Sequence, residues 1–164
     1  MTDYDTILAA RSRWAVALGA LPRERVLALG ADLAARFEVT PAAVPQSGLT
    51  LLTLRDSVEK QAFYLGEIPL STCHVFLRDG ATTVEGGAMF MADDVDLVSA
   101  MAICDGVLAN RLGGWETVAD GVRDGLDRLD EEARLRNTML KRSRVNFALL
   151  NQEDDETGEK EDGQ

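Results

Sequence analysis

The sequence predicts an α+β fold: an antiparallel sheet with hairpins, flanked by N-terminal helices and C-terminal helices and followed by a disordered acidic tail. Apolar residues recur at helical spacing near both ends of the chain, which predicts the helices. The middle is rich in strand-forming residues joined by short connections, which indicates antiparallel pairing. Of the 164 residues, 46% are hydrophobic and 27% are charged, as in one ordinary globular domain. The domain is expected over residues 1–150 and the tail over residues 151–164.

Two helices are expected before the sheet. Apolar side chains recur every three or four positions over residues 5–19, which predicts an amphipathic helix. Leu21 and Pro22 then break the chain, and a proline suits the first turn of a second helix. The apolar face of this second helix consists of Val26, Leu29, Leu33 and Phe37.

The middle of the chain is expected to form the sheet. A loop over residues 40–48 precedes it, because two prolines remove two backbone donors within a few residues. Asp79-Gly80 lies between apolar runs and indicates a hairpin turn, whereas Gly86-Gly87 indicates a bulge. The expected strands cover residues 48–55, 61–67, 71–77 and 82–91, with interruptions at Gly66 and Pro69.

Two further helices are expected after the sheet, over residues 93–110 and 115–136, separated by Gly113-Gly114. Asp93, Asp94 and Asp96 at the start of the first helix could be read as ligands of Mg²⁺. Carboxylates at a helix N-terminus, however, accept hydrogen bonds from the first N–H groups and favour the helix dipole. Helix capping is therefore the favoured interpretation.

The formal net charge of the chain is −11, which argues against binding to a nucleic-acid backbone. Residues 151–164 carry seven acidic side chains against Lys160 alone, and such a segment is typical of disorder. No run approaches the roughly 18 apolar residues that a membrane span requires, and no basic region followed by an apolar stretch opens the chain. A cytoplasmic protein without a membrane segment is expected.

The sequence offers little for catalysis. It contains no phosphate-binding G-x-x-x-x-G-K-[ST] loop, no dinucleotide G-x-G-x-x-G and no G-x-S-x-G nucleophile motif. Cys73 and His74 would point to opposite faces of a strand, so they would not bind one metal together. Cys73 and Cys104 are expected to be buried free thiols. We therefore expect no catalytic residue, cofactor or metal ligand.

Four stretches, in the same order, resemble the PhnG family of the bacterial carbon–phosphorus lyase system. The first is the R-x-x-W of Arg11 and Trp14, and the second is F-x-L-G-E, residues 63–67, with the strand that follows it. The third combines the hairpin Asp79-Gly80 and Gly87 with the A-x-x-D of Ala102 and Asp105, and the fourth is Ser143-Arg144-Val145-Asn146-Phe147 near the end. Together they cover roughly residues 11–150.

The chain departs from the family pattern in two places. Near the end, Asn146 stands where the family has aspartate, and Ala148-Leu149-Leu150 replaces an F-T-M-like continuation. After the hairpin, Ala92-Asp93-Asp94 replaces a glycine–arginine–aspartate run. If either family residue contacts a phosphate or a partner, this chain must make that contact differently.

The resemblance implies a function at the level of an assembly. PhnG-type proteins associate with PhnH-, PhnI- and PhnJ-type subunits. With a PhnL-type protein they support transfer of an alkylphosphonate to the ribose of a nucleoside triphosphate, with displacement of the base. The resemblance therefore implies an accessory or non-catalytic subunit of a phosphonate–ribose triphosphate transferase. A purely structural assembly subunit, without any contribution to the active site, is the alternative.

Three residues of the ordered region are candidates for a partner interface. Arg11 and Trp14 belong to the residue types that dominate interfaces. For Trp14, a core position on an amphipathic helix is the favoured interpretation, and a docking anchor is the alternative. Glu67 lies at the strand interruption, where it would be exposed and either contact a partner's arginine or have no role.

The segment over residues 141–150 provides the other interface candidates, namely Arg144, Val145, Phe147 and Leu149. If the segment is extended, its three apolar side chains share one face. It would then either pair with the chain's own sheet or add as a strand to a neighbouring subunit. Arg144 would supply a forked contact to a carboxylate or phosphate.

Overall fold

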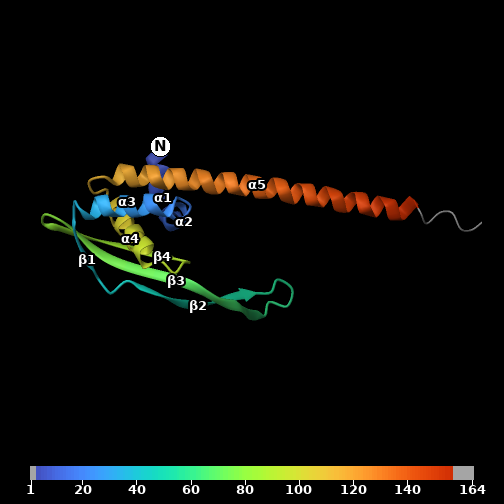
Figure 1. The fold of residues 1–164 in the computed structure, drawn as a ribbon, viewed down its shortest axis with the longest axis horizontal. Coiled ribbons are helices and arrows are strands. Elements are labelled where there is room, and N and C mark those ends of the chain that lie inside the picture. Colours follow the sequence, from blue (N-terminus) through green and yellow to red (C-terminus); the bar gives the residue numbers. More distant parts are fainter. Residues whose placement is uncertain (1–2, 157–164) are drawn as a thin grey trace, which may run out of the picture. The chain divides into compact units, whose positions relative to one another are not determined.

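The computed structural model describes residues 3–156, with side chains described over residues 4–141 (Figure 1). It is α+β, as the sequence predicts, with four antiparallel strands among the described residues. The chain divides into two units, Met1–Leu126 and Asp127–Gln164. The first contains the sheet and the core, and the described part of the second is helix.

The N-terminal region forms three short helical pieces and one longer helix. They are α1 (Asp3–Ala9), a 3₁₀ turn over Arg11–Arg13, α2 (Trp14–Gly19) and α3 (Arg23–Ala34). The prediction of one helix over residues 5–19 is wrong, because Ala10 leaves the helical conformation at φ −104° and ψ 40°. Pro22 precedes the first turn of α3 rather than occupying it, and its carbonyl accepts from Arg25 N–H at 3.0 Å.

The sheet consists of β1 (Glu38–Pro41), β2 (Gln46–Arg55), β3 (Ala62–Asp79) and β4 (Thr82–Phe90). The prediction of separate strands on either side of Gly66 and Pro69 is wrong, since β3 runs through both residues. In place of a break, β3 has a register shift opposite Leu52 and Thr53, where Gly66 adopts a φ of +150° that suits glycine. β1 includes the first two residues of the loop expected over residues 40–48.

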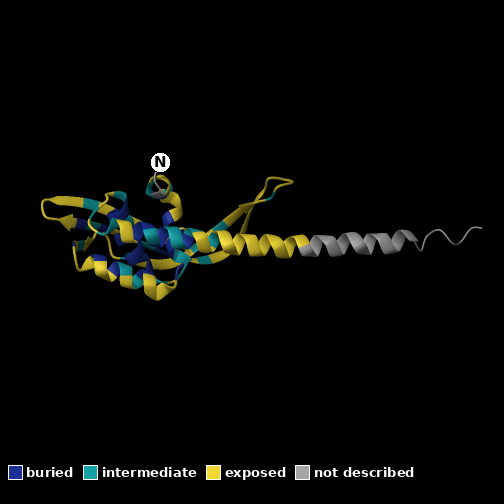
Figure 2. Cartoon of the chain, turned by 90° about the horizontal axis from the view of Figure 1, so that it is seen from above, coloured by how far each residue is buried: buried dark blue, intermediate teal, exposed yellow. Residues whose placement is uncertain are grey.

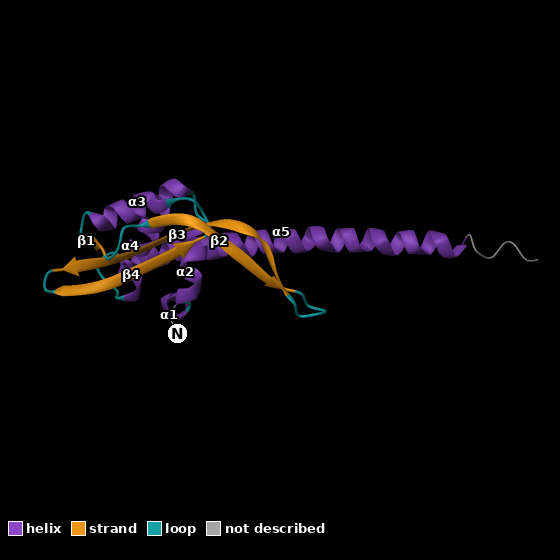
Figure 3. Cartoon of the chain, turned by 90° about the horizontal axis from the view of Figure 1, so that it is seen from below, coloured by secondary structure: helices purple, strands orange, loops and turns teal. Residues whose placement is uncertain are grey.

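β3 is the central strand, and all three other strands pair with it (Figure 3). Ser71 and Thr72 pair with β2 and with β4 at once, so these two strands lie on opposite edges of β3. β1 pairs with residues that also pair with β4, so β1 shares the edge of β2. The sheet is therefore three strands wide near its middle.

The β3–β4 hairpin confirms one turn prediction and contradicts one bulge prediction. Asp79-Gly80 forms the turn, with Gly80 at φ +59°. The pairing of β3 with β4 continues without a shift through Gly86 and Gly87, so no bulge forms there. Gly86 instead allows helix α4 (Val95–Ala109) to approach the strand, because a Cβ at this position would lie 2.2 Å from the Ala102 carbonyl oxygen.

The core lies between one face of the sheet and the helices (Figure 2). Alternate residues of β3 point into it, and Cys73, Val75 and Leu77 are buried beside Ser71. His74 points to the opposite, exposed face, as the alternation predicts. Cys73 and Cys104 are both free and buried, as expected.

The N-terminus of α4 confirms the capping interpretation. The Asp94 carboxylate accepts a hydrogen bond from Leu97 N–H at 2.9 Å, which satisfies one of the free donors of the first turn. The same carboxylate accepts from the Arg23 guanidinium at 2.6 Å, and Asp93 accepts from the Ser47 hydroxyl at 2.5 Å. Among the described residues, no three His, Cys, Asp or Glu side chains are grouped as a metal site would need.

The last helix, α5 (Trp115–Glu156), is far longer than expected. Its first three turns belong to the core, where Val118, Ala119 and Val122 are fully buried. The extended conformation considered for residues 141–150 is not found, because their backbone is helical. No proline or glycine stands between Gly125 and Gly158 to end the helix.

The helix also covers residues 151–156, the beginning of the expected disordered tail. Residues 157–164 lie outside the described residues, so the disorder of the tail stays a prediction. None of the helices in the described part of the chain is both long and apolar enough to cross a membrane.

Candidate functional site

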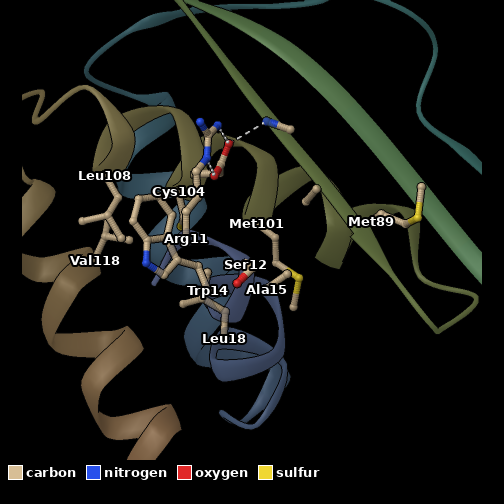
Figure 4. A pocket seen from close by; sticks show the side chains of 13 residues that line it. Arg11, Ser12, Trp14, Ala15, Leu18, Met89, Met101, Cys104, Leu108 and Val118 are labelled. Atoms are coloured by element: carbon tan, nitrogen blue, oxygen red, sulfur yellow. Dashed lines mark hydrogen bonds and ion pairs between the residues drawn. The ribbon is translucent and has the colours of Figure 1, made fainter. Parts of the chain in front are cut away.

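A cluster of polar groups joins three segments that lie far apart in the sequence (Figure 4). The Asp105 carboxylate on α4 accepts two hydrogen bonds from the Arg11 guanidinium, at 2.9 Å from Nε and 2.7 Å from Nη2. It also accepts from the Gly87 backbone N–H at 3.0 Å. The forked contact fixes the 3₁₀ turn of Arg11 against β4 and α4.

The electrostatics of this cluster favour the charged form of the Arg11 guanidinium. The hydrogen bonds from Arg11 to Asp105 raise the pKa of the guanidinium, and the opposite charge of the carboxylate adds to the effect. The Asp105 side chain is 12% exposed and the Arg11 side chain 59%. Arg11 therefore retains donors that face outward, while the carboxylate is occupied.

A cavity of about 380 Å³ lies beside the cluster. Its walls are mainly apolar and come from α2, α4, α5 and β4. The deeper wall consists of Trp14, Leu18, Met101, Cys104, Leu108 and Val118. A volume of this size is within the range of small-ligand pockets.

Trp14 is a core residue of the first unit. It is 3% exposed, and its indole N–H donates to the Ile7 carbonyl at 2.8 Å. The same carbonyl also accepts from Ala10 N–H at 3.1 Å, so two donors meet it where the chain breaks between α1 and α2. The burial favours the core interpretation of Trp14 over its use as an exposed docking anchor. Arg11 lies over the ring at 6.0 Å and connects it to the polar cluster.

The chemistry available at the cavity is limited. Burial raises the pKa of the Cys104 thiol to about 12, so this group stays protonated and is a poor nucleophile at neutral pH. His74 lies on the opposite face of the sheet, 3.3 Å from Glu85. The arrangement can position groups and bind, and among the described side chains that line it no hydrogen bond joins a base to a nucleophile.

The second feature is an apolar arm, which we define as residues 49–69 of the β2–β3 hairpin. Large side chains on both of its faces are exposed: Leu49, Leu51, Leu54, Val58, Phe63, Tyr64 and Leu65. Figure 2 shows this ribbon as exposed nearly throughout. Glu67 is exposed on it, opposite Leu51. Apolar surface of this kind usually marks a contact with another molecule.

The interface candidates fall into three groups. Arg11 lies at the polar cluster, Trp14 beneath it in the core, and Glu67 on the arm. Arg144, Val145, Phe147 and Leu149 belong to the helical backbone of α5, and their side chains lie outside the described residues. Whether any of the seven contacts a partner remains a prediction.

Sequence reasoning missed two parts of this site. Asp105 and Gly87 were recognised only as motif positions, not as partners of Arg11, although both lie in the matched stretches. The exposure of the arm was also missed. The signal was present in β2, where leucines occupy both odd and even positions, and therefore both faces of the strand, instead of alternating with polar residues.

Comparison with known proteins supports the motif resemblance. The sequence model of the family described as phosphonate metabolism protein PhnG matches residues 9–152. Among curated proteins, no relative matches the chain. The family match covers most of the chain, including Arg11, Gly87 and Asp105 and the whole sheet. The chain therefore belongs to the PhnG family, which implies a role in phosphonate metabolism.

Proposed function

We propose that this protein is a cytoplasmic subunit of the carbon–phosphorus lyase core complex. In this role it supports the transfer of an alkylphosphonate to the ribose of a nucleoside triphosphate, with displacement of the base. Its partners are PhnH-, PhnI- and PhnJ-type subunits and a PhnL-type protein. The observation that carries the proposal is the apolar arm, together with the family match over residues 9–152.

The arm supports a role in binding a partner because it exposes large apolar side chains to solvent in the isolated chain. Leu49 is 69% exposed, Tyr64 69% and Leu65 62%, although removing these apolar side chains from water would be favourable in free energy. A two-stranded ribbon is marginally stable in water when nothing covers it. Burial against another subunit would remove this apolar surface from water and stabilise the ribbon.

The polar cluster supports an accessory role. Arg11 and Asp105 neutralise one another, and the thiol nearest to them is held protonated by burial. Such a site contributes shape and hydrogen-bond donors to a neighbouring active site more readily than it performs proton transfer. The transfer chemistry itself would then belong to a partner.

The test is co-expression of the chain with PhnH-, PhnI- and PhnJ-type proteins from the same genome, followed by size exclusion and an assay of base release with the PhnL-type protein present. We expect one complex that contains this chain and releases base only when the chain is included. The isolated chain should have no turnover. Elution of the chain alone, or equal turnover without it, would contradict the proposal.

A purely structural assembly subunit remains the second candidate, because the arm alone supports either role. Asp105→Asn and Glu67→Gln separate the two. Lost turnover in an assembled complex would favour a contribution to the active site. Lost assembly, or unchanged turnover in both variants, would favour the structural role.

A further inference from the structure

β2 is an edge strand along all ten of its residues (Figure 3). It pairs with β3 on one side, and no described strand lies on the other. β1 shares the same edge of β3, but it pairs with Val75 to Arg78, beyond the end of β2. A row of backbone groups of β2 therefore faces outward.

The register shows which groups these are. The Ala42 N–H donates to the His74 carbonyl at 2.9 Å, so the backbone of His74 faces the edge shared by β1 and β2. Backbone groups of an antiparallel strand alternate between its two sides. Between Thr72 and the register shift at Gly66, the even-numbered residues of β3 therefore bond to β2. Their partners are the even-numbered residues of β2, such as Gly48 opposite Leu70. The N–H and carbonyl groups of Ser47, Leu49 and Leu51 point away from the sheet.

The two edges of the hairpin differ in how they are protected. Beyond the end of β4, the free edge of β3 carries Glu67 and Pro69. By the same alternation the Pro69 nitrogen faces outward, where it cannot donate to an added strand. β2 has neither a proline nor a charge from Gln46 to Leu54. Charges and prolines are the usual protection of an edge against unwanted pairing, so the unprotected edge of β2 is suited to pairing.

We propose that the outer edge of β2 accepts a β-strand from a partner subunit, which extends the sheet by main-chain hydrogen bonds. This inference rests on the proposed function and names how the arm is bound. Leu49 and Leu51 lie on one face of β2, and Leu52 and Leu54 on the other. The added strand must therefore be apolar on both faces.

The charge of the chain selects a partner over a second copy. Each chain carries a net charge of −11, so two copies repel one another. A strand from a subunit with basic residues beside it would be attracted instead. The occupant is therefore an apolar strand with basic flanks, from a different polypeptide.

A pair of variants at one position separates the edge from the side chain. Leu49→Ala and Leu49→Pro both remove the leucine, but only proline removes the outward N–H. In co-expression with PhnH-, PhnI- and PhnJ-type proteins, Leu49→Ala should still co-elute. Leu49→Pro should weaken binding by about tenfold or more, since it loses a hydrogen bond and places its ring against the added strand.

Three results would overturn the inference. Co-elution of Leu49→Pro as strong as that of Leu49→Ala would exclude strand addition and leave the proposed function intact. Failure of the wild-type chain to co-elute would exclude both. Dimerisation of the isolated chain that Leu49→Pro abolishes and Leu49→Ala keeps would identify a second copy as the occupant.

Amide hydrogen exchange in the wild-type complex provides a test that does not depend on the folding of the proline variant. The amides of Ser47, Leu49 and Leu51 should exchange rapidly in the isolated chain and become protected in the complex. The amides of Gly48 and Thr50, which face β3, should change less. Unchanged exchange at the three outward amides in a formed complex would overturn the inference.

Discussion

At the scale of single residues, Asp94 combines two stabilising contacts. Its carboxylate caps α4 through Leu97 N–H and accepts two hydrogen bonds from Arg23. The bonds from Arg23, followed by the one from Leu97, hold the pKa of Asp94 below its ordinary value. The side chain is 19% exposed, so solvent screens this interaction only partly.

We expect Asp94→Ala to lower the free energy of unfolding by about 1–2 kcal/mol at pH 7, because it removes the cap and leaves Arg23 without its closest acceptor. A depressed folded-state pKa stabilises the fold above the unfolded pKa of about 3.9. This contribution is lost as the pH falls through the folded-state pKa. Urea unfolding between pH 3 and 7 should therefore show a difference between wild type and variant that shrinks below about pH 4.

Asp94→Asn is the matched control, since its side-chain oxygen still accepts from Leu97 N–H while the charge is absent. It should lose less stability than Asp94→Ala at pH 7, and its difference from wild type should likewise shrink below about pH 4, because both variants lack the titrating carboxylate. Equal losses in the two variants would mean that the charge pair with Arg23 carries the effect, and the cap does not.

Gly86 and Gly87 are neighbours in β4 with opposite surroundings. A Cβ at Gly86 would lie 2.2 Å from the Ala102 carbonyl oxygen and 2.7 Å from the Gly106 nitrogen, both in the backbone of α4. A Cβ at Gly87 would meet nothing closer than the Cys73 carbonyl oxygen at 3.8 Å. The first position requires glycine for packing, and the second does not.

Gly86→Ala should therefore lower the free energy of unfolding by about 2 kcal/mol or more, because strand and helix backbone must separate. Gly87→Ala should stay within about 0.5 kcal/mol of wild type. Chemical denaturation of the two variants side by side measures both values. Similar stabilities would show that α4 can move away from β4 at little cost.

At the scale of elements, turns and helix caps were predictable from the sequence, whereas the full length of a strand was not. The turn at Asp79-Gly80 and the cap at Asp94 follow from two or three neighbouring residues, and both are found. β3 could not be predicted as one strand, because Pro69 normally ends a central strand. Here its nitrogen faces the open side beyond the end of β4, where no ladder bond is required.

The candidate site was predictable in its parts and not in its assembly. Arg11, Gly87 and Asp105 each belong to a recognisable stretch, but their contact depends on how α4 crosses the sheet. That crossing is set by packing at Gly86 and Gly106, which no periodicity reveals. The length of α5 was missed for a related reason, since a polar helix gives only a weak apolar pattern.

The arm should contribute little to the stability of the isolated chain, because its side chains are already exposed. We expect Phe63→Ser with Tyr64→Ser to change the free energy of unfolding by less than about 1 kcal/mol. The double variant should also bind less of an apolar dye such as ANS, because it carries less exposed apolar surface. Denaturation and dye fluorescence measure the two effects.

Leu77→Ala on the same strand is the control for the core. Leu77 is fully buried, so its truncation should cost about 2–5 kcal/mol. A loss of comparable size in the Phe63 and Tyr64 variant would mean that the arm packs against the protein in solution and is not open to a partner.

At the scale of the whole molecule, the two units differ in their content of buried hydrophobic side chains. Every buried hydrophobic residue of the described core lies between Ile7 and Val122, within the first unit. The described side chains of the second unit contribute none of them. The first unit therefore contains the elements that an independent fold needs, and the described side chains of the second unit are not part of its core.

A chain that ends at Asp130 tests this division. It keeps the buried part of α5 through Val122 and should show a Tm within about 3 °C of the full-length protein, since roughly 1 kcal/mol shifts Tm by a few degrees in a domain of this size. Thermal unfolding followed by circular dichroism measures it. A fall beyond about 8 °C would show that the helix past residue 130 stabilises the first unit. With stability unchanged, loss of co-elution with the partner subunits would support an interface within residues 131–164, the segment that contains Arg144, Val145, Phe147 and Leu149. Retained co-elution would assign assembly to the arm, because β2 and its outward amides remain intact in the shorter chain.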